Sequence, residues 1–207
     1  ISYKGSGSRR DVPVSTTGRV TGGGLHRLSV EKLVGELDSR LLSRRGLALD
    51  ELERRPAAEV ARSLRQSLRG YGGLSRAYVF HALGRLGVLG EADLAGAVSD
   101  QDPVVRVHAQ RLLAETPLAG EKYSALILSG FKDPDPMVRR AAVQAASNSP
   151  GQSFIRPLLG LHQSTPRGDV HLDHSIRIAL RNHLRNTEWF RKLAAQKLSD
   201  PEVGLVL

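Results

Sequence analysis

The residues that could carry out acid–base chemistry in this sequence are aspartates that precede an arginine by four positions. The three pairs are Asp102 with Arg106, Asp135 with Arg139, and Asp173 with Arg177. A carboxylate beside a guanidinium could serve as a catalytic acid with a cationic partner, or it could cap a helix and join an ion pair. Since an active site is seldom copied into successive repeats, the recurrence favours a structural role.

The spacing of these pairs predicts a repeat. The interval is 33 residues from Asp102 to Asp135 and 38 residues from Asp135 to Asp173. We expect the stretch STPRGD, residues 164–169, to be a loop insertion that lengthens the second step. In the first two copies the aspartate is followed by proline, a combination that predicts a helix start, because aspartate accepts from free N–H groups and proline has none to leave unpaired.

Apolar residues also repeat, at spacings of 4, 7 and 8 after Val105 and Val138, and at spacings of 4 and 8 after Ile176, where His183 stands at the spacing of 7. These spacings trace one face of a helix. A pair of helices cannot bury such faces alone, whereas a stack of pairs can. The sequence therefore predicts an all-α protein, a right-handed α-solenoid (an α–α superhelix) of helical hairpins.

Two regions of the sequence differ in amino-acid composition. Residues 1–24 are rich in glycine, serine and threonine and predict an extended N-terminal linker, which could be the end of an upstream domain. Residues 25–207 predict the repeat domain. A further helix start at Asp200 is followed by only seven residues, so we expect this domain to be truncated at its C-terminus.

Composition narrows the classes of function. The chain of 207 residues has no cysteine and a net charge of +9, which excludes disulfides and thiolate metal sites within it. Residues 1–76 hold 15 basic and 8 acidic residues. This surplus makes a nucleic-acid-binding solenoid, similar to the DNA-alkylation-repeat proteins, the alternative function. Aromatic residues, which such a groove would need, make up only 4% of the chain.

These features together resemble HEAT repeats over about residues 75–207. In that family an aspartate in the turn between two helices and an arginine in the second helix form a ladder through the stack. The resemblance assigns the three Asp–Arg pairs to this ladder and implies a fold of HEAT-like hairpins. A degenerate earlier unit is expected over residues 25–68.

The run Ser75–Glu115 is also similar to the HEAT region of large multidomain bacterial proteins known as membrane-bound dehydrogenases. That resemblance implies a parent oxidoreductase with a β-propeller before the repeats and a cytochrome c domain after them. Ile1–Gly5 would be the last propeller strand. It also implies a periplasmic or exported location. The haem motif of that family is missing from this sequence, so no cofactor is expected within it.

No catalytic, cofactor-binding or metal-binding residue is predicted. His171, Asp173 and His174 could form a metal site, but the ladder already accounts for Asp173. We expect a non-catalytic scaffold that binds a protein partner, or neighbouring domains of the same polypeptide, on the concave face of the second helices. The contacts predicted for that face are His108, Arg111, Arg140 and Gln144. No apolar run approaches 18 residues, so no membrane insertion is expected.

Overall fold

The computed structural model describes residues 24–116 and 119–206, and all regular structure in these residues is helical. The predicted linker, apart from Gly24, lies outside the described residues. The helices are η1 (Leu25–Arg27), α1 (Val30–Gly35), η2 (Glu36–Asp38), α2 (Leu42–Leu52), α3 (Ala57–Ser67), α4 (Gly73–Arg85), α5 (Glu91–Val98), α6 (Pro103–Glu115), α7 (Ala119–Lys122), α8 (Ser124–Gly130), α9 (Pro136–Asn148), α10 (Gln152–Ser164), α11 (Val170–Leu184), α12 (Thr187–Ala194) and α13 (Asp200–Val206). The η elements are 3-10 helices.

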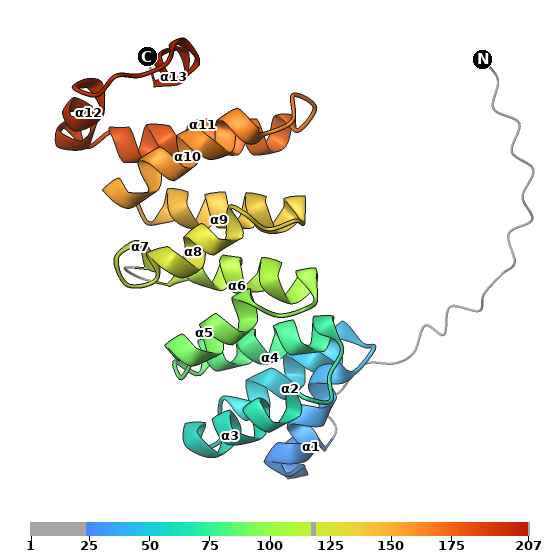
Figure 1. Cartoon of the computed structure of the whole chain (residues 1–207). Helices are drawn as coiled ribbons and strands as arrows, with labels where there is room; N and C mark the ends of the chain where they lie inside the picture. Colours follow the sequence, from blue (N-terminus) through green and yellow to red (C-terminus); the bar gives the residue numbers. More distant parts are fainter. Residues whose placement is uncertain (1–23, 117–118, 207) are drawn as a thin grey trace, which may run out of the picture.

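The helices form hairpins that stack along one axis (Figure 1). The hairpins are α3 with α4, α5 with α6, α8 with α9, and α10 with α11. The second helix of each hairpin packs on the second helix of the next, so that α4, α6, α9 and α11 form a continuous second-helix layer. The first helices α3, α5, α8 and α10 make up the first-helix layer. This arrangement confirms the prediction of an all-α solenoid.

The core lies between the two layers, where the repeating apolar positions face one another. Along α6 and α9 the predicted stripes are almost fully buried, with exposed fractions between 0 and 6%. They consist of Val105, Ala109, Leu112, Leu113, Val138, Ala142, Ala145 and Ala146. The alanines of α9 bring α6 and α11 close to it, because a short side chain keeps little space between helix backbones.

The two ends of the stack are less regular. Before α3, a compact unit of η1, α1, η2 and α2 covers the region predicted to be a degenerate repeat. Its link to the stack includes a hydrogen bond of 2.8 Å from the Tyr71 hydroxyl to the Val34 carbonyl. At the other end, α12 and α13 pack on α11. No helix in the described part of the chain is both long and apolar enough to cross a membrane.

Helices α6, α9 and α11 begin at aspartate caps, whereas the N-cap of α4 is Gly72. One of the aspartate caps corrects the predicted period. The Asp102 carboxylate accepts from the Val104 N–H at 2.9 Å, and Asp135 accepts from the Met137 N–H at 2.7 Å. The third cap is Asp169, which accepts from the Leu172 N–H at 3.1 Å.

The third helix therefore begins four residues before the predicted start at Asp173. Asp169 follows Asp135 by 34 residues, so residues 164–169 form the ordinary turn of the repeat and the predicted insertion is wrong. The prediction aligned the copies on their arginines. In the third copy Asp173 stands one turn into the helix, at the place of Arg106 and Arg139, and no proline marks the true start.

Candidate interaction surface on the second helices

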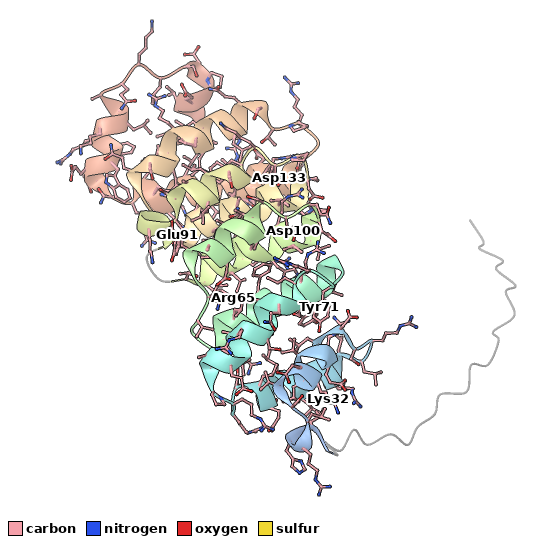
Figure 2. The ribbon with its side chains drawn as sticks, turned by 60° about the horizontal axis from the view of Figure 1, so that its bottom comes forward. Lys32, Arg65, Tyr71, Glu91, Asp100 and Asp133 are labelled. Atoms are coloured by element: carbon pink, nitrogen blue, oxygen red, sulfur yellow. The ribbon has the colours of Figure 1, made fainter. Side chains whose placement is uncertain are left out.

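Two arginines of the second-helix layer bind aspartates in the turn before the next second helix. The Nε and Nη2 groups of Arg76 donate to the Asp100 carboxylate at 2.9 and 2.7 Å. Arg106 donates in the same way to Asp133, at 2.7 and 2.9 Å. We call each such bidentate pair a rung. Figure 2 shows Asp100 and Asp133 along the same edge of the stack, so the rungs tie successive hairpins together there.

Each rung aspartate also shapes its own turn. Asp100 accepts from the backbone N–H of Asp102 at 2.8 Å, and Asp133 accepts from that of Asp135 at 2.9 Å. Burial would raise the pKa of Asp133, but the hydrogen bonds from Arg106 and from the Asp135 N–H lower it below its usual range. The carboxylate stays charged and fixes both the turn and the arginine of the preceding hairpin.

These contacts correct the predicted pairing within the ladder. Asp102 and Asp135 cap helices, as the sequence analysis expected of Asp102, but Arg106 reaches Asp133 instead of Asp102. A capping carboxylate is turned toward the N–H groups of its own helix, whereas the arginine four residues later points to the next hairpin. The sequence does carry the signal, since a second aspartate precedes Asp102 and Asp135 by two residues in both copies.

The third predicted pair does not connect hairpins. Arg177 Nε donates to Asp173 at 2.9 Å, one turn away on the same helix α11. Asp173 also contacts His162 Nε2 at 2.8 Å, which joins α10 to α11. In the residues that the structure describes, no group of three or more potential ligands could hold a metal ion at these histidines or elsewhere.

At the third step of the stack the rung is missing. Arg139 Nη1 donates to the carbonyls of Asp133 and Pro134 at 2.8 and 2.9 Å, just as Arg106 Nη1 binds the carbonyls of the preceding turn. The residue two positions before the cap is now Arg167 where the earlier turns have aspartate. Across residues 24–116 and 119–206, no carboxylate forms a hydrogen bond with Arg139.

A groove crosses the second-helix layer over α9, between α6 and α11, with a volume of about 400 Å³. Its lining consists of Arg111, Met137, Arg140, Ala141, Gln144, Ser147, Asn148, Ser175, Ile178 and Asn182. Three of the four residues predicted to contact a partner, Arg111, Arg140 and Gln144, are thus brought together here. Among the described residues that line the groove, none bears a carboxylate.

Some polar side chains of this groove form hydrogen bonds within the protein, and others do not. Arg140 is paired, since its Nη2 donates to Asp169 Oδ1 at 2.5 Å. The Asn182 amide donates to the Ser147 hydroxyl at 2.8 Å, which fixes α11 against α9. By contrast, the side chains of Arg111 and Gln144 form no hydrogen bond with any described residue.

His108, the fourth predicted contact, lies outside the groove. Its Nδ1 is 2.9 Å from His81 Nε2, so the two rings join α6 to α4 edge to face. Burial lowers the pKa of both imidazoles, and for His108 the nearby His81 and Arg111 lower it further. A single proton between the two nitrogens makes this a structural contact between neighbouring hairpins at neutral pH.

The basic part of the chain, residues 1–76, holds three doublets of adjacent arginines, at residues 9–10, 44–45 and 54–55, and the last two doublets are largely engaged within the protein. Arg44 pairs with Glu36, and both Arg54 and Arg55 bind Glu51. The remaining doublet, residues 9–10, lies outside the described residues. Of the eleven basic residues between positions 24 and 76, five bind a carboxylate: Arg44, Arg54, Arg55, Arg65 and Arg76.

Comparison with known proteins agrees with the observed stack of hairpins. Residues 90–173, from the start of α5 into α11, match the family described as HEAT repeats. The matched residues, 84 of the 207, are therefore similar to HEAT repeats.

Two other comparisons are less informative. The crystal structure of an engineered protein from the Northeast Structural Genomics Consortium is similar to it, with a TM-score of 0.49 and 18% identity over 86% of this chain and 94% of that one. No curated protein sequence matches the chain.

Proposed function

We propose that this chain is a non-catalytic scaffold that binds an extended segment of a protein partner in the groove over α9. The observation that carries the proposal is the pairing of two unused polar groups, Arg111 and Gln144, with apolar side chains in the same groove. Met137 and Ile178 are 48% and 36% exposed, although both are large and apolar. Arginine and methionine are enriched where proteins bind one another.

The chemistry of the groove suits a peptide chain. The amide of Gln144 can donate to a backbone carbonyl and accept from a backbone N–H at once. The guanidinium of Arg111 can bind a carboxylate or a carbonyl, and Met137 and Ile178 can cover an apolar side chain. Because Arg140 and Asn182 are held by Asp169 and Ser147, the walls of the groove are fixed before a partner arrives, which lowers the entropy lost on binding.

Peptide selection on the whole chain tests this proposal. Peptides recovered from a random display library would be measured by fluorescence anisotropy against Arg111→Ala and Gln144→Ala. We expect each substitution to weaken binding by about tenfold, the effect of losing one good polar contact. The matched controls are Lys132→Ala, just after α8, and Gln163→Ala, on α10, both in the first-helix layer. They should leave affinity unchanged. If the controls weaken binding and the groove variants do not, the proposal is wrong.

The parent protein is a separate part of the proposal. The similarity of Ser75–Glu115 to the repeat region of membrane-bound dehydrogenases supports a role in spacing the domains of such an exported, multidomain oxidoreductase. Sequencing the gene on both sides of this region is the test. A propeller-coding stretch upstream and a Cys-x-x-Cys-His haem motif downstream are expected, and a reading frame with neither would refute this context.

A further inference from the structure

We propose that the missing third rung, at Arg139 and Arg167, is a binding site for a carboxylate side chain of the partner, so that the bound segment is acidic. The inference rests on the proposed function in one respect, namely that the ligand is a protein segment. The site itself follows from comparing three equivalent positions within the same chain.

Arg139 is positioned as Arg76 and Arg106 are. Each of the three arginines stands four residues after a helix cap, and each donates through Nη1 to a carbonyl of its own preceding turn. The positive charge of each also acts on the cap aspartate of the next hairpin, which is Asp102, Asp135 and Asp169 in turn. Nη1 therefore anchors the guanidinium to its own preceding turn at all three steps.

What differs is the other half of the guanidinium. At the first two steps Nε and Nη2 hold an aspartate carboxylate. At the third step these two groups of Arg139 have no partner among the described residues and are not buried. The side chain that replaces the aspartate, Arg167, is exposed and adds a second positive charge. Asp169 is bound by Arg140 and forms no hydrogen bond with Arg139.

The first two rungs identify the ligand. The Nε–Nη2 edge of an arginine matches the two oxygens of a carboxylate. At both complete rungs an aspartate carboxylate occupies this edge. A glutamate or aspartate from another molecule would complete the third rung in the same way. Met137 and Arg140, the neighbours of Arg139 on α9, line the groove. A single extended segment can therefore place an acidic residue at the rung and the residues beside it in the groove.

The sharpest test supplies the missing carboxylate from within the chain. Arg167→Asp restores the residue type found at Asp100 and Asp133 and should close the rung. The probe is a fluorescein-labelled oligoglutamate peptide at physiological ionic strength, with an oligoglutamine peptide of equal length for comparison. We expect Arg167→Asp and Arg139→Gln each to weaken oligoglutamate binding by about tenfold, and oligoglutamine to bind poorly throughout.

The control is Arg62→Asp, which makes the same change in net charge on α3. Arg62 is exposed and far along the chain from the rung. We expect this variant to keep oligoglutamate affinity within about twofold of the original. If Arg62→Asp weakens binding as much as Arg167→Asp, the peptide binds general positive charge and the inference is overturned. Displacement of the peptide by inorganic phosphate at lower concentrations than by acetate would overturn the choice of carboxylate.

Thermal unfolding provides a readout that needs no ligand. A closed third rung should raise the unfolding midpoint of Arg167→Asp by about 2–4 °C, and Arg62→Asp should not raise it. A lower midpoint for Arg167→Asp would show that the third step does not share the geometry of the first two. These results are independent of Arg111 and Gln144, so failure at the rung leaves the groove to be judged by its own variants, and the converse holds.

Discussion

His183 is a buried polar residue whose ionisation bears directly on stability. It lies on α11 and is fully buried against the start of α10. There its Nδ1 accepts from the Gly151 N–H at 3.0 Å and its ring packs on Phe154. Burial lowers its pKa to about 4. The imidazole is therefore neutral in the folded protein at pH values where it would be protonated in the unfolded chain.

We predict that this histidine makes the protein less stable as the pH falls from about 6.5 to about 4. Its contribution is fully present above the unfolded pKa, because neither state then binds a proton. Below that pH the unfolded chain binds a proton at this histidine and the folded chain does not. This difference lowers the free energy of unfolding by up to about 3 kcal/mol. Urea titrations of the original chain and of His183→Asn across this range measure the effect. Equal losses in both proteins would show that other groups cause it.

The rungs give a second prediction at this scale. Arg106→Met should lower the free energy of unfolding by about 2 kcal/mol, because it leaves the shielded Asp133 carboxylate without its cationic partner. The matched variant Arg177→Met breaks only an exposed pair within α11 and should cost less than about 0.5 kcal/mol. Chemical denaturation of the two variants would contradict the account of the rungs if their costs were the same.

At the scale of elements, helix starts marked by Asp-Pro could be predicted from the sequence. Helices α6 and α9 begin at Pro103 and Pro136, as the cap chemistry requires. The start of α11 was missed because Asp169 has no proline after it and because Asp173 imitates the motif one turn later. The apolar stripes were also predictable, since their spacing depends only on the geometry of a helix.

The contacts between helices were harder to predict from the sequence. Spacing alone places Arg111, Arg140 and Gln144 on one layer, but it does not show that Arg140 is held by Asp169 from the next hairpin. The same limit applies to the rungs, since the partner of Arg106 depends on how far successive hairpins are shifted along each other. That shift is set by side-chain packing between layers and has no local signal in the sequence.

Close packing of α8 on α9 is tested at Gly130. A methyl group there would lie 2.6 Å from the Ala142 Cβ and 2.7 Å from Gln110 Nε2. Gly130→Ala should therefore destabilise the protein by about 1–3 kcal/mol through overpacking. Gly96→Ala on α5, where the added methyl meets nothing within 4 Å, should be neutral or stabilising by up to about 1 kcal/mol. A neutral Gly130→Ala in thermal unfolding would contradict this packing.

At the scale of the whole molecule, the solenoid builds one long surface from equivalent positions of successive hairpins. Where the repeat is regular, as at the first two rungs, polar groups satisfy each other and hold the stack together. At α9 the pattern changes, since Arg139 has no carboxylate, Arg111 and Gln144 have no partner among the described residues, and Met137 is exposed. These unused groups gather on and beside one helix, which is why we assign binding to that part of the layer.

Photocrosslinking tests this assignment most directly. Benzoylphenylalanine would be placed at Ser175 in the groove, and in a second protein at Gln163 on α10, and each would be irradiated with a peptide selected on the original chain. We predict a crosslink from position 175 that excess unlabelled peptide abolishes, and none from position 163. Crosslinking from position 163 with none from position 175 would contradict the claim that the groove over α9 is the partner-binding surface.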